Sequence, residues 1–141
     1  MALQQGLTTS FKQQMVQGAQ NLATDSLKIA LYTGFATLGP DNTVYVTTNE
    51  VPAGGGYEAG GKPLTGVTIS TDSTTGIVYI NFSNVVWDPA AFTARGALIY
   101  NTTRSNASVA VLDFGADKTA TNTFTVTMPV NSVSSALLRF T

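Results

Sequence analysis

The sequence predicts a mainly β protein, an antiparallel β-sandwich with one short N-terminal α-helix. Three observations carry this expectation. Short segments alternate apolar residues with threonine and other polar residues, which is the period of a strand with one buried face. Clusters of turn-forming residues separate these segments, and only one stretch of the chain has a helical period. About eight such strands are typical of a jelly roll, which we therefore expect.

The helical stretch is residues 9–23, TSFKQQMVQGAQNLA. Ser10 and Gln13 have the spacing of a capping box, in which each side chain binds a free backbone N–H of the first turn. The apolar stripe is expected to pack against the sheet, and docking on a partner is the alternative. The residues of the stripe are Phe11, Met15, Ala19 and Leu22.

The strands follow in a regular series of alternating segments. Residues 71–76, TDSTTG, predict a turn, and residues 102–106, TTRSN, predict a hairpin loop. Pro129 should end the strand that contains it, because proline cannot donate a hydrogen bond to a neighbouring strand. The predicted strands are 27–33, 43–48, 66–70, 76–87, 93–101, 107–115, 122–130 and 135–141.

The length of 141 residues suits a single domain with one core, which we expect to comprise residues 1–141. An N-terminal arm and helix would occupy residues 1–24, and the sandwich would occupy residues 25–141. Residues 38–66 form a long glycine-rich loop, and loops of such length in compact domains usually have a function.

The composition excludes several classes of function. Charged residues are 11% of the chain, less than half of the usual share of about 25%. The seven basic residues are scattered singly, so neither nucleic acid nor a membrane surface is expected as a partner. The absence of Cys and His excludes thiolate metal sites, thiol nucleophiles and a Ser-His-Asp triad. We expect no enzyme, no cofactor and no metal. Low charge favours close packing against neighbours.

Residues 56–63, GYEAGGKP, have the spacing of a phosphate-binding loop, with Gly61-Lys62 four residues after Gly56. Such a loop requires a Ser or Thr after the lysine and a helix after the loop. Here Pro63 follows the lysine, and a strand pattern follows the proline. We interpret the segment as a glycine-rich turn.

Other chemistry has weaker support. The eight carboxylates leave a catalytic pair for glycoside hydrolysis as an alternative, and Asp113 and Asp117 could together reach one Ca²⁺ ion. Most carboxylates lie beside turn-forming residues, where caps and turns explain them. Trp87 and Tyr57 could stack on a sugar, but Trp87 continues the apolar run NVVW, which favours packing in the core. The N-terminus lacks a secretory signal pattern, and no apolar run approaches the roughly 20 residues that span a bilayer.

Five segments resemble small virion proteins of tailed bacteriophages. They are GLTTSFKQQ near the start, LKIALYT at 27–33, TTNEVPAGGGYEAGGKPLTG at 47–66, ARGALIYN at 94–101 and SVAVLDFG at 108–115. The resemblance spans most of the chain, keeps the order of the segments and includes no catalytic motif. It implies a capsid cement (decoration) protein, a jelly-roll subunit that binds the outside of the assembled capsid and bridges capsomers. A tail or fibre subunit that recognises a host receptor or a polysaccharide is the alternative.

The resemblance also implies partners and a location. The partners would be the major capsid protein and further copies of this chain, with a dimer favoured. The protein would be made in the host bacterial cytoplasm and reside on the capsid exterior of the virion. The candidate contact segments are residues 2–11 and 38–66, because an arm can add a strand to a neighbour's sheet and a glycine-rich loop can order on a partner. The candidate interface residues are Leu3, Leu7, Phe11, Tyr57 and Lys62.

Overall fold

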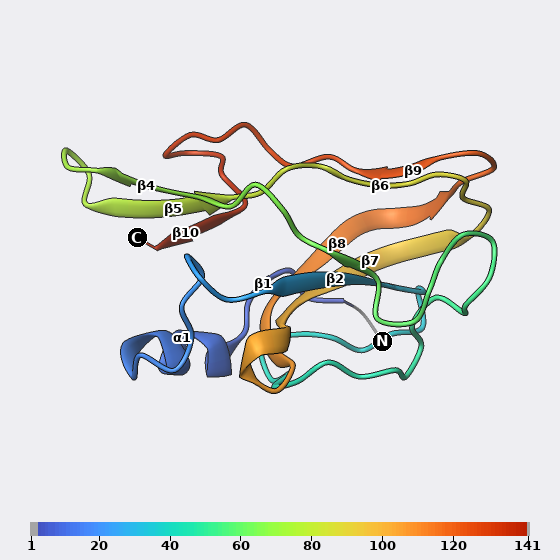
Figure 1. The fold of residues 1–141 in the computed structure, drawn as a ribbon, viewed down its shortest axis with the longest axis horizontal. Helices are drawn as coiled ribbons and strands as arrows, with labels where there is room; N and C mark the ends of the chain where they lie inside the picture. The colour runs from blue at the N-terminus through green and yellow to red at the C-terminus, as the bar shows by residue number, and fades with distance from the viewer. Residues whose placement is uncertain (1–2, 141) are drawn as a thin grey trace.

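The structure, a computed structural model, describes residues 3–140 of the chain. A five-stranded antiparallel sheet of order β1-β8-β7-β2-β3 forms one layer. A three-stranded sheet, β10-β5-β4, and a two-stranded sheet, β6-β9, lie on the other side of the molecule (Figure 1). The elements are β1 (Gly6–Leu7), α1 (Thr9–Val16), β2 (Leu27–Tyr32), β3 (Lys62–Pro63), β4 (Thr68–Asp72), β5 (Ile77–Asn81), β6 (Val85–Trp87), β7 (Thr93–Asn101), the 3-10 helix η1 (Thr102–Arg104), β8 (Ala107–Thr119), β9 (Phe124–Val126) and β10 (Leu138–Phe140).

The mainly β antiparallel fold with one short N-terminal helix is therefore confirmed. The described strands form three separate sheets and no closed barrel. Their order does not establish a jelly roll, which stays a prediction.

The main core lies between the two layers. Ile29 of β2 and Val109 of β8 belong to the same buried cluster as Ile80 of β5 and Phe124 of β9. Trp87 is 1% exposed, and its ring centroid lies 6.1 Å from that of Phe124. The prediction that Trp87 packs in the core is confirmed.

A second core covers the opposite face of the five-stranded sheet. Tyr32 of β2 and Leu98 of β7 are buried there under Leu3, Ala36 and Leu38. The expectation of one wet face is therefore wrong for the central strands, because the arm and the segment after β2 cover that face.

The helix is shorter than predicted and begins with a different cap. Thr8 is the N-cap residue, and its hydroxyl accepts a hydrogen bond from the Phe11 N–H at 3.3 Å. Ser10 lies inside the helix, so the predicted capping box is wrong. The helix ends at Val16, and Gly18 follows with a left-handed φ of 72°. Phe11 packs inward, with its ring centroid 6.0 Å from that of Phe140 on β10.

Most predicted strands exist, with changed boundaries. Residues 93–101 form β7 as predicted, and the turn at 71–76 and the hairpin loop at 102–106 are both present. The predicted strand at 43–48 is wrong, since Val44 makes only an isolated bridge. The predicted strand at 76–87 is two strands, β5 and β6.

The sequence pattern did not predict the two shortest strands. In the arm, β1 pairs with β8 of its own chain, Gly6 opposite Val111. At the other edge of the sheet, β3 contains Pro63, which an edge strand tolerates because one side of it needs no hydrogen bonds. Within residues 3–140, no helix is long and apolar enough to cross a membrane.

Candidate functional site

The five residues predicted for the interface do not form one surface. Leu3, Phe11 and Tyr57 are buried within the subunit, at 7%, 0% and 2% exposure. Leu7 of β1 is half-buried, and Lys62 of β3 donates from Nζ to the Val86 carbonyl at 2.7 Å. For the three buried residues, docking on a partner would require their segments to leave the subunit's own cores. The interface role of the set stays a prediction.

The glycine-rich loop packs backbone against backbone. A Cβ atom on Gly61 would lie 1.8 Å from the Ile29 carbonyl oxygen, and one on Gly56 would lie 1.9 Å from the Pro89 carbonyl oxygen. The short strand β3 follows the loop, so no helix N-terminus is available for a phosphate. The interpretation of this segment as a turn is confirmed, because its glycines allow close approach to the sheet.

A cluster of tyrosines around Glu50 fixes the long loop. Glu50 Oε1 accepts a hydrogen bond from Tyr45 at 2.6 Å, while Oε2 accepts one from Tyr57 at 2.5 Å and one from the Gly60 N–H at 2.7 Å. Burial raises the pKa of Tyr57, and the hydrogen bond to Glu50 raises it further. Burial also raises the pKa of Tyr100 to about 12. These hydroxyls therefore stay protonated at neutral pH and act as hydrogen-bond donors.

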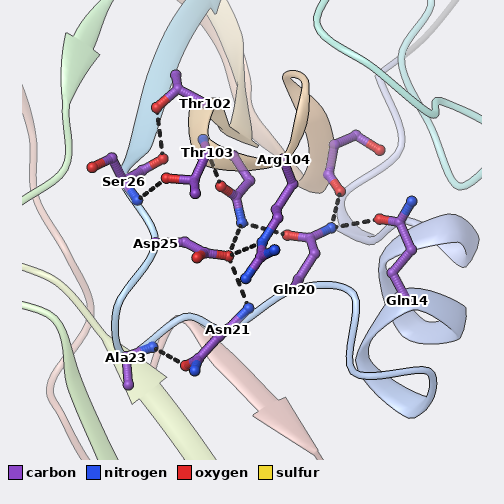
Figure 2. A network of polar contacts seen from close by, with 11 residues as sticks. Gln14, Gln20, Asn21, Ala23, Asp25, Ser26, Thr102, Thr103 and Arg104 are labelled. Atoms are coloured by element: carbon purple, nitrogen blue, oxygen red, sulfur yellow. Dashed lines mark hydrogen bonds and ion pairs between the residues drawn. The ribbon is translucent and has the colours of Figure 1, made fainter.

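A second polar network joins the segment after α1 to the β7–β8 hairpin (Figure 2). Asp25 Oδ2 accepts hydrogen bonds from Arg104 Nε at 2.9 Å, from Asn101 Nδ2 at 2.8 Å and from the Asn21 N–H at 2.9 Å. Gln20 extends the network, since its Oε1 accepts from Asn101 at 3.0 Å. Burial opposes ionisation of Asp25, but the hydrogen bonds from Arg104, Asn21 and Asn101 outweigh burial and lower its pKa.

Asp25→Asn is expected to lower the unfolding free energy at pH 7 by about 2 kcal/mol, because charged hydrogen bonds are lost. The folded pKa of Asp25 lies below its ordinary value of 3.8. Its contribution to stability is therefore complete above that value and is lost as pH falls through the folded pKa. Urea unfolding between pH 7 and pH 2 should show this loss in the parent and in the exposed-site control Asp41→Asn. An equal acid-induced loss in Asp25→Asn would contradict this role.

The structure also places the residues of the candidate Ca²⁺ site and of the candidate sugar-stacking pair. Asp113 and Asp117 both face Arg95, at 3.8 and 3.9 Å, so a guanidinium occupies the place between them. Among residues 3–140, no group of three or more acidic side chains is arranged to hold a metal ion. The sugar-stacking alternative is wrong for Trp87 and Tyr57, because both rings are buried and face each other at 6.2 Å.

An apolar groove lies between α1 and the β10-β5-β4 sheet, and we call it the α1 groove. It consists of two adjoining hollows of about 510 and 440 Å³ that share Met15 and Phe140. Val16 is 89% exposed on the helix side, and Ile69 is 47% exposed on the sheet side. The first hollow is also lined by Lys12 and Arg139.

A second exposed apolar feature is the Phe35 turn, residues 33–36. The Phe35 side chain is 81% exposed, but its backbone N–H and its backbone carbonyl are both hydrogen-bonded. Its N–H donates to Thr33 Oγ1 at 3.4 Å, and its carbonyl accepts from Asn49 Nδ2 at 3.1 Å. Ala36 is buried directly after it. The turn therefore has a held backbone and presents an exposed aromatic ring to the solvent.

Both features have only faint signals in the sequence. Val16 is an apolar residue outside the stripe that begins with Phe11 and Met15, and Phe35 follows a glycine in a turn. A single apolar residue at either position is common in helices and turns, so the sequence does not indicate a contact surface there. The groove also depends on how α1 meets a sheet whose strands lie 50 or more residues away in the chain.

Comparisons with protein-family models, curated proteins and solved structures found no match for this chain. The assignment of function therefore relies on the contact surfaces of the molecule and on the resemblance described above.

Proposed function

We propose that the protein is a virion structural protein of a tailed bacteriophage, a capsid cement protein that binds the outer surface of the assembled capsid and bridges capsomers. Its partners are the major capsid protein and other copies of this chain. In this proposal the two layers of strands are a sandwich of the jelly-roll type.

The observation that carries the proposal is the distribution of exposed apolar side chains. Val16, Phe35 and Val130 are 89%, 81% and 75% exposed. They belong to α1, to the turn after β2 and to the segment between β9 and β10. Val16 lines the apolar α1 groove, and contiguous exposed apolar surface marks a contact site. Phe35 adds an exposed aromatic ring on a different segment. A subunit that bridges neighbours needs more than one such surface.

The low charge and the engaged polar groups also support a structural role. Glu50 and Asp25 bind side chains and backbone of their own subunit, so they hold the fold together. A cement protein acts by mass action, because a ligand that binds only the assembled capsid stabilises that state. Repetition over the capsid surface multiplies a modest contact into a large total.

The test is sedimentation of the purified protein with expanded empty capsids, with dispersed capsid subunits and with host cells. We expect it to pellet with capsids alone and to raise the temperature at which they disrupt. At a hundredfold excess over its dissociation constant, each occupied site gains about 2.7 kcal/mol.

Two other results would overturn the proposal in different directions. Binding to cells without binding to capsids would support a tail or fibre subunit. Hydrolysis of glycans that is lost on an Asp→Asn substitution would support an enzyme.

A further inference from the structure

The α1 groove is large enough to take an aromatic side chain. Each of its hollows, at about 510 and 440 Å³, exceeds the roughly 150 Å³ that holds a benzene ring. Ile69, Val78 and Ile80 line one hollow, and Met15 and Phe140 line both. The lining therefore offers apolar contact to an incoming ring.

The Phe35 turn carries an exposed aromatic side chain on a held backbone. Its ring is exposed, and the hydrogen bonds from Phe35 N–H and from Asn49 fix the backbone that carries it. Leu38, 3% exposed, anchors the segment that leaves the turn in the second core. A side chain on a rigid turn loses little backbone freedom on binding, which favours its use as an anchor.

The charges beside the two features are opposite in sign. Lys12 and Arg139 line the groove, and among residues 3–140 no Asp or Glu does. Beside the Phe35 turn, Asp117 Oδ1 lies 3.3 Å from the position that a Cβ atom on Gly34 would take, and the Asp117 side chain is 64% exposed. Arg95, whose Cβ lies 3.9 Å from the same Gly34 position, contacts both Asp117 and Asp113. Two carboxylates therefore face one guanidinium beside the turn, which leaves an excess of one negative charge. Charges of opposite sign on two surfaces steer them together.

The two features lie at opposite ends of the molecule. In Figure 1, α1 and the β10-β5-β4 sheet are at the left end of the long axis, and β2 runs from that side toward the right, where residues 33–36 follow it. The Phe35 turn therefore cannot reach the groove of its own chain.

We propose that the Phe35 turn of one copy binds in the α1 groove of a second copy. The Phe35 ring enters the apolar groove, and Asp117 approaches Lys12 and Arg139. Each copy then uses different surfaces toward its two neighbours, so the contact is head-to-tail and builds a ring or a chain, unlike a two-fold dimer. This contact specifies the self-association included in the proposed function, and its test requires no capsid.

Sedimentation velocity of the purified chain, at up to about 1 mM so that even millimolar dissociation constants are detected, tests the contact. We expect the parent chain to associate. Phe35→Ser and Val16→Asp should each weaken association at least about tenfold, because one removes the aromatic anchor and the other places a carboxylate in the groove. Val67→Ser, which changes an exposed apolar residue outside both surfaces, should leave association unchanged.

The decisive sample is an equimolar mixture of Phe35→Ser and Val16→Asp. One variant keeps an intact groove and the other keeps an intact turn, so the mixture should form a one-to-one dimer although each variant alone is monomeric. A parent chain that stays monomeric, a mixture that stays monomeric, or association that survives Phe35→Ser would overturn the inference. Capsid binding without self-association would overturn this contact alone, and self-association without capsid binding would overturn the proposed function alone.

Discussion

Gly61→Ala is expected to lose at least about 4 kcal/mol of unfolding free energy, which is at the severe end for a single substitution. The new Cβ atom would lie 1.8 Å from the oxygen and 2.6 Å from the carbon of the Ile29 carbonyl. Ile29 is fully buried in the inner strand β2, paired with Ile99 on β7, so this backbone cannot yield without disturbing the sheet. Gly61 also has a φ of 78°, which L-residues disfavour.

Gly76→Ala is the matched control for Gly61→Ala. Gly76 has a similar φ of 74°, but no atom lies within 4 Å of its added Cβ. Backbone strain alone should cost about 1 kcal/mol there. Urea unfolding followed by the fluorescence of Trp87, the single tryptophan, measures both variants. Equal losses would show that strain decides the effect and that the close packing of the loop on β2 contributes nothing.

The sequence predicts the boundaries of a strand well when those boundaries depend on local signals. The strand over 93–101 lies between a proline-containing segment and a hairpin loop, and both of its ends are where the pattern places them. The helix start shows the limit of such signals. Thr8 and Ser10 are both hydroxyl residues that can cap, and long-range pairing selects between them, because the Thr8 N–H donates to the Val109 carbonyl at 3.0 Å.

The second core could not be predicted from alternation. Tyr32 and Tyr100 lie on the face of the five-stranded sheet that is turned away from the main core, and each hydroxyl donates to a carbonyl in the long loop. Tyr32 donates to the Val46 carbonyl at 2.5 Å, and Tyr100 donates to the Gly60 carbonyl at 2.7 Å. Tyrosine suits either environment, so its position in the sequence does not reveal burial. The sequence pattern did not predict the α1 groove either. The groove forms only in the folded chain, where α1 packs beside strands that are distant from it in the sequence.

The Tyr57 hydroxyl links the long loop, residues 38–66, to strand β2. Strand β3 pairs with β2 only at Lys28 and Ile29, so β3 is too short to offer a hydrogen-bond partner to the Leu31 N–H. The Tyr57 hydroxyl takes the neighbour's place, accepting from the Leu31 N–H at 2.9 Å while donating to Glu50 Oε2 at 2.5 Å. Leu31 is fully buried, so water does not replace that acceptor.

Tyr57→Phe is therefore expected to lower the unfolding free energy by about 3 kcal/mol, because a buried N–H and a carboxylate oxygen each lose a partner. Tyr45→Phe is the control. It removes one hydrogen bond to the same carboxylate and keeps a half-buried ring stacked on Tyr100 at 4.7 Å, so it should cost about 1 kcal/mol. Urea unfolding gives both values, and amide hydrogen exchange at Leu31 should accelerate only in Tyr57→Phe. Unchanged exchange at Leu31 would mean that this hydroxyl does not support the strand.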